Sequence, residues 1–477
     1  MMSSTSETIW HDDLLGRRQE ALLLTGYIES IFDRDLLKAR GGAYTIAVDA
    51  TYGLGKTFFL KRLAEELKMN HPVAFIDAWT DDLADDPLIA LISTLKRAVY
   101  PQIEKEKHSA NWSHFLEKSG KVAAIAGLGV IKRGAGFIIG TPALEATEAL
   151  LSTSGEAVRD AAEQAITDAS SDAIDAVAGS LTREPDHIRR RIEEFEAGQR
   201  AIAQMKESLT TFIAGLSEGE QHPPVIIIID ELDRCRPSYA IKLLEEIKHL
   251  FDVPGIIFIF GVHSGQLSHS VKWAYGSDFD GESYLARFIN RSYTLRTPDS
   301  TRLIDYMINK TGLGTNSFFP LSRSLTGQTR KTNSLTDIIR IYVERLSITP
   351  RELFSLFDIL ETAVRISAGN KIILPYLLPL IVCRIRKVDP DHIAWKHNGT
   401  TFLVGRDETE YDPTAMFEYY WHRREYSDRQ IVSENDPDRD YMTVVMFESA
   451  IENGHAAEGL ADFRNYAVLI DSVCRFQ

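Results

Sequence analysis

The stretch YTIAVDATYGLGKTFFLK, from Tyr44 to Lys61, contains an apolar run, a glycine-bearing turn that ends in Gly-Lys-Thr, and then residues with helical spacing. This order predicts a buried strand whose loop wraps backbone N–H groups around a chain of phosphates, with the positive end of the next helix aimed at the same charge. Lys56 would reach the outer phosphates, and Thr57 would give its hydroxyl to a Mg²⁺ ion held between them. The residues that we predict to contact the phosphorylated ligand are Thr51, Tyr52, Gly53, Leu54, Gly55, Lys56, Thr57 and Phe58.

A second stretch, HPPVIIIIDELDRC at residues 222–235, supplies the carboxylates that such a site requires. Its β-branched run predicts a strand buried on both faces, and that strand ends in Asp230 and Glu231. Asp230 is placed to hold the magnesium ion opposite Thr57. Glu231 is placed to take a proton from an attacking water or to orient it, and Asp233 is an alternative for this base or acts behind it. We expect this strand to lie parallel to the first one and next to it.

The composition of the whole chain excludes some classes of protein. With 477 residues it has room for about two to four domains. A formal net charge of −15 argues against broad electrostatic capture of nucleic acid, although a local basic groove is still allowed. The three widely spaced cysteines form no zinc-binding pattern and no disulfide framework. The N-terminal residues lack the apolar core of a signal peptide, so we expect a cytoplasmic protein.

Two further segments carry candidate residues. In many proteins with a phosphate-binding loop of this kind, a short segment like DDLLGRR lies near the base of the nucleotide. By that analogy Leu15, Gly16 and Arg17 are candidates for contact with adenine or ribose, and a surface helix start explains them equally well. A strand at VAFID follows the helix after the glycine-bearing turn, which makes a βαβ unit and favours a parallel sheet. Asp77 and Trp79 lie where that strand ends, on the side of such sheets where ligands bind.

Residues 101–182 are rich in Ala, Gly, Ser and Asp and look at first like a membrane hairpin. The charge-free runs Val122–Ile131 and Gly134–Leu144 have only ten or eleven residues, whereas a membrane-spanning helix needs about twenty. We therefore expect no transmembrane span and favour an inserted helical element packed against the core or a partner. Peripheral membrane contact through residues 121–151 and insertion into the membrane remain as alternatives.

Four stretches together make the chain resemble the KAP-type P-loop NTPases, a branch of the additional-strand ATPases related to the STAND and AAA+ groups. The stretches are Tyr52–Thr57, Ile76–Trp79, Asp230–Cys235 and Tyr284–Ile289. The resemblance covers about residues 10–365. The chain departs from the family pattern at Ala50 in place of the first loop glycine, at Asp77 in place of Asn, and at His263 in place of the Asp usual after the fourth strand.

The resemblance implies an α/β fold with a parallel P-loop sheet of about five strands in the order 5-1-4-3-2, a helical insertion and a C-terminal helical region. After the three strands named above, the fourth is expected at GIIFIFGVHS, which ends at His263 and Ser264, and the fifth at Ser292–Thr297. The domain division that we predict is 1–100 for the first part of the NTPase core, 101–216 for the insertion, 217–300 for the second part of the core, 301–389 for a helical lid, and 390–477 for a partner or assembly region.

The resemblance also implies that the chain binds ATP with Mg²⁺ and hydrolyses the ATP slowly. His263 or Ser264 would be the polar sensor of the γ-phosphate, unless both are plain loop residues. Arg287, with Arg291 nearby, would act on the phosphate of a neighbouring subunit, although surface arginines are the commoner explanation. Arg351 would be the sensor arginine that a C-terminal helical lid places over the nucleotide.

Two kinds of function are compatible with these features. The first is a motor or remodelling ATPase that acts on a partner or on nucleic acid. The second, which we favour, is a nucleotide-gated switch or scaffold that self-associates and works with a separate effector protein, because the sequence carries no second enzymatic motif and no strong basic tract. Members of the family recur in anti-phage defence, so the resemblance suggests that role. The expected partner surface is either the insertion at residues 101–182 or the region after residue 390.

Overall fold

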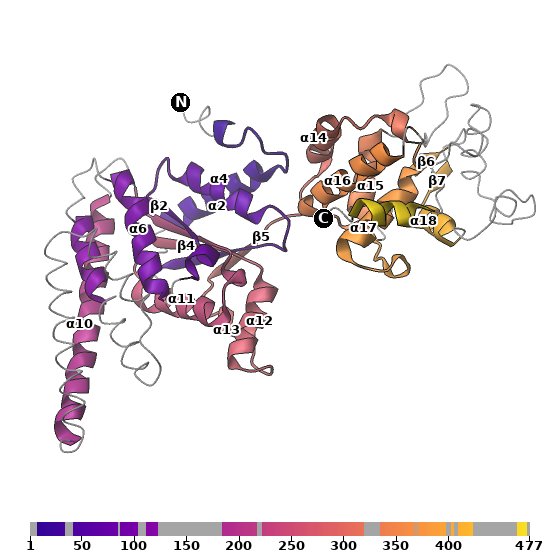
Figure 1. Cartoon of the computed structure of the whole chain (residues 1–477). Coiled ribbons are helices and arrows are strands. Elements are labelled where there is room, and N and C mark those ends of the chain that lie inside the picture. The colour runs from indigo at the N-terminus through magenta and orange to yellow at the C-terminus, as the bar shows by residue number, and fades with distance from the viewer. Residues whose placement is uncertain are drawn as a thin grey trace, which may run out of the picture. The chain divides into compact units, whose positions relative to one another are not determined.

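The computed structural model of the chain describes only part of it (Figure 1). The described residues are 7–33, 42–83, 86–103, 111–122, 184–216, 222–318, 334–367, 369, 371–396, 402–404, 409–422 and 465–474. They form two compact units. The first contains Met1–Asp12, Arg18–Tyr52 and Lys56–Arg296, and the second contains Asp13–Arg17, Gly53–Gly55 and Thr297–Gln477.

The first unit is built on a five-stranded parallel sheet with the order β2-β3-β4-β1-β5. Its strands are β1 (Tyr44–Asp49), β2 (Val73–Asp77), β3 (Val225–Asp230), β4 (Ile256–Val262) and β5 (Arg291–Thr294). The predicted order is confirmed. The expectation that the strand over 225–229 lies next to the first strand is wrong, because β4 pairs with both β1 and β3 and separates them. The predicted order itself already required this separation.

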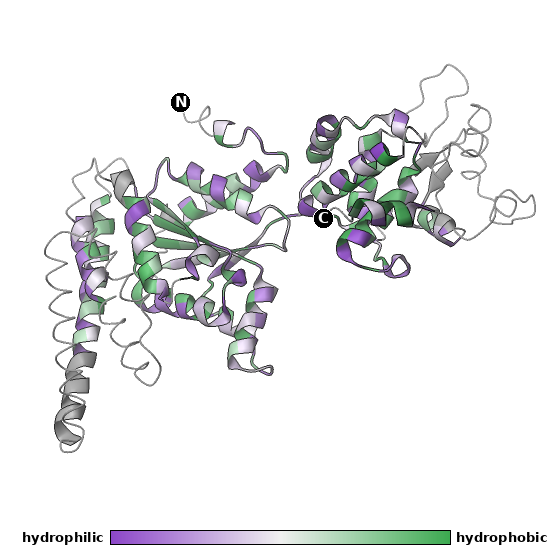
Figure 2. Cartoon of the chain, in the orientation of Figure 1, coloured by the Kyte–Doolittle hydropathy of each residue, from purple (hydrophilic) through white to green (hydrophobic). Residues whose placement is uncertain are grey.

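Burial along the strands follows from their sequences. Every residue of β3 and β4 is buried, as expected of apolar, β-branched runs in the middle of a parallel sheet. The edge strand β5, with the polar sequence RSYT, is largely exposed. Figure 2 shows the strands as the apolar centre of the unit.

Helices cover both faces of this sheet (Figure 1). On one side lie α2 (Arg17–Asp33) and α4 (Lys56–Leu67). The core of the other face is shared by α6 (Pro87–Ile103), a helix over residues 111–122, α10 (Glu184–Leu216), α11 (Pro237–Leu250), α12 (Ser264–Tyr275) and α13 (Gly281–Leu285). Two short turns follow strands directly, namely α5 (Ala78–Asp81) after β2 and the 3₁₀ turn η1 (Leu232–Arg234) after β3.

The second unit is mainly helical. It contains α14 (Thr301–Thr311), α15 (Leu335–Leu346), α16 (Pro350–Ile366), α17 (Leu374–Arg386), α18 (Pro413–His422), α21 (Tyr466–Val473) and the hairpin β6 (Phe402–Val404) and β7 (Thr409–Tyr411). Capping boxes begin α15, with Ser334 and Asp337, and α16, with Thr349 and Glu352. The helix α17 is buried along most of its length, so its apolar sequence serves the core of this unit.

Within the described residues, no helix has the length and apolar character needed to cross a membrane. Most of the predicted insertion lies outside the described residues, including the run Gly134–Leu144 and nearly all of 121–151. The C-terminal residues 423–464 lie outside them as well. The expectations made for these segments stay predictions.

Candidate functional site

The loop after β1 is anchored to the end of β4. The Asp49 carboxylate accepts a hydrogen bond from the Ser264 backbone N–H at 3.0 Å, and the Ala50 N–H donates to the Val262 carbonyl at 3.2 Å. Ala50 therefore still belongs to strand-like backbone at the start of the loop, where a glycine is not needed for backbone freedom. The loop then turns and α4 begins at Lys56.

Two glycines in this loop have backbone angles that favour glycine. Gly53 has a φ of 86° and Gly55 a φ of 85°, both in the left-handed region. A side chain at either position would be strained, because residues with a Cβ rarely adopt such angles. The two glycines that the sequence analysis singled out are therefore required by the shape of the loop.

Lys56 reaches the carboxyl end of β3. Its Nζ lies 3.7 Å from Oδ1 of Asp233, and the two side chains are only 10% and 1% exposed. A buried ammonium group needs a counter-charge, and Asp233 supplies one. The structure thus brings together a loop lysine and a strand-end carboxylate that are far apart in the sequence.

Asp230, the last residue of β3, is almost fully buried, at 1% exposure. Its Oδ1 accepts a hydrogen bond from the Glu231 N–H at 2.9 Å, whereas Oδ2 has no hydrogen-bond partner within the described residues. Burial raises the pKa of Asp230, and the nearby Thr57 hydroxyl and the Glu231 N–H offset this only in part. A buried carboxylate oxygen without a partner costs free energy unless a ligand or metal ion fills the place.

Space for this carboxylate comes from Gly261 in β4. Gly261 is paired in register with Asp230, and a Cβ placed on it would lie 2.4 Å from Oδ1 of Asp230 and 2.4 Å from a methyl carbon of Leu60. Real Cβ atoms essentially never come this close, so any other residue here would displace the Asp230 or Leu60 side chain. Gly261 was not among the residues predicted from the sequence, although a single glycine within the apolar run IIFIFGV is itself a sign that another group approaches closely.

Glu231 has an unusual backbone. Its φ of 60° and ψ of 25° place a non-glycine residue in the left-handed region. Such a conformation costs about 1–3 kcal/mol and is found where function demands a particular side-chain direction. Burial raises the pKa of Glu231, and the Arg234 guanidinium lowers it again in part. The Glu231 and Arg234 side chains form an ion pair at 3.1 Å.

Four planar side chains form a row across the strand ends, and each follows a different strand. Arg234 lies with its guanidinium carbon 5.6 Å from the centre of the Tyr52 ring and 5.7 Å from that of Trp79. The His263 ring lies 5.4 Å from the Tyr52 ring. Burial, together with the neighbouring Asp233 carboxylate, raises the pKa of Tyr52 to about 12, so its hydroxyl keeps its proton.

The other predicted site residues are placed as follows. Thr51 is exposed, and the Phe58 ring packs under the Arg62 guanidinium at 3.7 Å. Ser264 holds Asp49 through its backbone N–H, and the His263 ring lies in the row of planar groups. The sensor role predicted for one of these two residues stays a prediction. Asp77 caps α5 by accepting from the Thr80 N–H at 3.2 Å.

The three predicted arginines have different surroundings. Arg287 is exposed after α13, with its guanidinium 5.8 Å from the Tyr284 ring. In the second unit, Arg17 is fully buried and donates to the Leu54 carbonyl, and the backbone N–H of Arg351 donates to the Gly53 carbonyl at 3.3 Å. The roles predicted for these arginines stay predictions.

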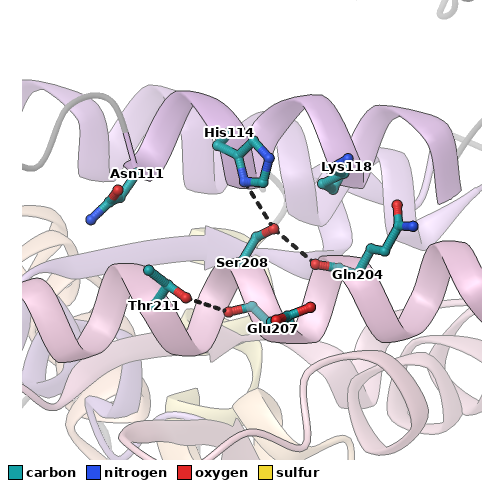
Figure 3. Close-up of a pocket in the computed structure, with 7 residues that line it drawn as sticks. All are labelled: Asn111, His114, Lys118, Gln204, Glu207, Ser208 and Thr211. Carbon is teal, nitrogen blue, oxygen red and sulfur yellow. Dashed lines mark hydrogen bonds between the residues drawn. The ribbon is translucent and has the colours of Figure 1, made fainter.

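A separate hollow of about 270 Å³ lies between the helix over residues 111–122 and α10 (Figure 3). Its lining residues are Asn111, His114, Lys118, Gln204, Glu207, Ser208 and Thr211. The Ser208 hydroxyl donates to the Gln204 carbonyl at 2.8 Å, so its contact with Nδ1 of His114 at 3.1 Å needs a hydrogen on the ring nitrogen. The mixed charge of this lining favours no particular class of ligand.

Comparison with known proteins gives one match. A family model described as the KAP family P-loop domain matches residues 26–366, which is more than half of the chain. The predicted extent of the resemblance, about 10–365, agrees with this match except at its first residues. A search of curated proteins found no similar sequence.

Proposed function

This chain belongs to the KAP family of P-loop NTPases, and from that premise we propose that it binds ATP together with Mg²⁺ and hydrolyses it slowly. One observation carries the proposal: Lys56 and Thr57, at the start of α4, meet the buried carboxylates that end β3. Phosphate charge needs such a lysine, and a magnesium ion needs such oxygens. The preference for adenine rests on family analogy alone.

The residues fit a magnesium ion. Mg²⁺ is usually held in proteins by one or two oxygen side chains, with phosphates and waters completing its octahedron. Asp230 has a buried oxygen without a hydrogen-bond partner, and the Thr57 hydroxyl is close to it. Thr57 and Asp230 would therefore hold the ion, which would neutralise the charge of the phosphates.

Glu231 is the better candidate for the general base. Asp233 is 1% exposed and already pairs with Lys56, whereas the Glu231 side chain is 16% exposed and its pKa is raised by burial. Glu231 would accept a proton from water as the water oxygen bonds to the γ-phosphorus and the bond to the leaving ADP oxygen breaks. Asp233 would then serve to orient Lys56.

The cellular role that we propose is a nucleotide-gated switch or scaffold in the cytoplasm that self-associates and acts with a separate effector protein, in anti-phage defence. The net charge of −15 supports this over a motor that tracks nucleic acid. In this scheme ATP binding assembles the complex and hydrolysis resets it. Arg287 would contribute to the site of a neighbouring copy, His263 would sense the γ-phosphate, and Arg17 and Arg351 would contact the nucleotide.

The test is steady-state ATP turnover of the purified chain with Mg²⁺, with EDTA, and with added DNA or RNA. Light scattering after size exclusion, with and without ATP, gives the oligomeric state in parallel. Slow Mg²⁺-dependent turnover, together with assembly driven by ATP, is the expected result. Strong stimulation by nucleic acid would instead support the motor, and the absence of both ATP binding and turnover would reject the proposed activity. Lys56→Ala controls for contaminating ATPases, since it removes the phosphate-binding charge.

A further inference from the structure

Arg234 has surroundings that an ordinary surface arginine lacks. Its guanidinium lies near two aromatic rings, Tyr52 from the phosphate-binding loop and Trp79 from the turn after β2, and pairs with the Glu231 carboxylate. We propose that Arg234 is a positioning residue that contacts Tyr52 and Trp79 and fixes the Glu231 carboxylate in place. This inference rests on the proposed hydrolysis of ATP, in which Glu231 is the base.

The local backbone brings the two charged side chains together. Glu231 precedes the 3₁₀ turn Leu232–Arg234, and the Arg234 N–H donates to the Glu231 carbonyl at 3.1 Å. In 3₁₀ geometry the side chains at positions i and i+3 lie one above the other. The left-handed φ of Glu231 sets the start of this turn, so the strained backbone and the ion pair are parts of one arrangement.

The aromatic rings restrict where the guanidinium can go. Both ring centres lie within the distance of about 6 Å at which a cation is attracted to an aromatic face. An exposed ion pair alone adds little, because its two long side chains lose freedom when they are held together. Here the Arg234 side chain is 30% exposed, and Tyr52 and Trp79, which are 41% and 54% exposed, add two further contacts to the ion pair.

The surroundings of Glu231 make this cation important. The carboxylates of Asp230, Asp77 and Asp233 lie close enough to act on Glu231 electrostatically, and Arg234 is the cation that bonds to it. Without Arg234 the Glu231 side chain would lose this bond and be repelled by its like-charged neighbours. A flat guanidinium can contact a carboxylate and an aromatic face together, which suits the compact ammonium group of lysine less well.

The experiment compares Arg234→Ala and Arg234→Lys with the wild type, measuring kcat and KM for ATP. For Arg234→Ala we expect kcat to fall by about tenfold or more while KM changes little, since a positioned base acts on the chemical step. Arg234→Lys, which keeps the charge, should have a kcat between those of the alanine variant and the wild type.

Arg236→Ala is the matched control. Arg236 lies two residues further on and pairs with Asp82 at 3.0 Å, so this variant removes an arginine ion pair from the same segment without touching Glu231. Its kcat and KM should match the wild type. If Arg234→Ala has wild-type or higher kcat, or if lysine does no better than alanine, the positioning role is overturned.

A second readout does not depend on turnover. The emission of Trp79, obtained as the difference between wild type and Trp79→Phe, should change in Arg234→Ala or Arg234→Lys without any nucleotide, because the guanidinium leaves the ring. An unchanged Trp79 emission would contradict the arrangement. If the wild type neither binds nor hydrolyses ATP, the proposed function itself is rejected. If the wild type is active and Arg234→Ala has the same kcat and KM, only this inference is rejected. Should the alanine variant not fold, the lysine variant decides through the same two readouts.

Discussion

The two units of the chain differ in how fully their carboxylates are hydrogen-bonded within the protein. At the end of β3, Asp230 has a carboxylate oxygen without a hydrogen-bond partner, and burial raises its pKa. At the start of α16, Glu352 receives two bonds from Arg386, at 2.7 and 3.0 Å, and one from the Thr349 N–H at 2.7 Å. Burial raises the pKa of Glu352 too, but these bonds outweigh it and the pKa is lowered.

This difference distinguishes the proposed binding site at Asp230 from the contact at Glu352, which only stabilises the fold. A carboxylate that only stabilises a fold should have its hydrogen bonds made within the protein, as Glu352 does. A carboxylate kept for a ligand must leave bonding capacity open, at a cost in stability. The contrast therefore predicts opposite effects for substitutions in the two places.

The largest effect is expected for the base. Glu231→Gln keeps the size of the side chain and removes its ability to accept a proton, so ATP hydrolysis should fall by about 100-fold or more while ATP binding remains. Single-turnover hydrolysis and equilibrium binding of a fluorescent ATP analogue measure the two properties. Asp233→Asn is the companion variant. If it abolishes hydrolysis while Glu231→Gln turns over normally, Asp233 is the base.

Asp230→Asn sharpens the comparison directly. It removes the buried charge, so we expect Mg²⁺-dependent ATP binding to weaken by about tenfold or more. In the absence of ligand the same variant should be more stable than the wild type, since the folded state no longer holds a poorly solvated carboxylate. Thermal unfolding with and without Mg²⁺ and ATP separates the two effects. Lower stability without ligand would show that Asp230 is satisfied within the protein.

Gly261→Ala tests the space that Asp230 occupies. The added methyl would lie 2.4 Å from the Asp230 oxygen and from Leu60, so β4 or its neighbours must shift. We expect a loss of about 1–3 kcal/mol in the free energy of unfolding, together with weaker Mg²⁺-dependent ATP binding. Alanine at Gly265, where the nearest atom is 3.9 Å away, is the control and should change neither. If Mg²⁺-dependent ATP binding is unaltered in Gly261→Ala, this binding does not require the Asp230 carboxylate to stay in the space beside Gly261.

The opposite behaviour is expected in the second unit. Arg386→Ala leaves Glu352 without its two charged bonds and should lower the free energy of unfolding by about 1–2 kcal/mol. ATP binding and hydrolysis should be unaffected, in contrast to the β3 variants. Denaturant unfolding and turnover measure this pair of outcomes, and Arg340→Ala, on the exposed face of α15, is the control for a surface ion pair. If Arg386→Ala is as stable as Arg340→Ala, the contrast between the two units does not hold.

The smallest effect is a dependence on pH. Because the pKa of Glu352 is lowered in the folded state, its ionised form contributes stability above the ordinary value of 4.5, and this is lost as the pH falls below that value. Wild-type stability should therefore decline more steeply than that of Arg386→Ala between about pH 5 and pH 3. Denaturant midpoints at several pH values give the two slopes. Parallel slopes would argue against a lowered pKa for Glu352.

Much of the first unit could be predicted from sequence because its signals are local. The run before Asp49, the glycines at 53 and 55, and the apolar run that ends in Asp230 each determine nearby structure, and the family resemblance supplied the strand order. The contacts among loops could not be predicted in the same way. The row of Tyr52, Trp79, Arg234 and His263 joins loops that follow four different strands, so it depends on sheet order and register rather than on any local pattern.

Backbone features were also beyond prediction. Nothing in the letters DELDR reveals that Glu231 adopts a left-handed conformation, because that is set by the tight turn into η1. The error about the neighbour of β1 has a different origin, because the predicted strand order already placed β4 between β1 and β3. The glycine-bearing turn and the strand-end carboxylates indicate which strands carry the site, but they do not require those strands to be adjacent.

The helix α10 has a mechanical consequence. Its 33 residues give it a length of about 50 Å, and its C-terminal part packs into the core through Met205, Leu209, Phe212, Ile213 and Leu216 (Figure 1). Because a helix moves as a rod, a rotation of this packed part is carried along its length. A rotation of about 5° moves a point about 50 Å away by about 4 Å. A change at the sheet too small to alter the core would therefore become a larger displacement along α10.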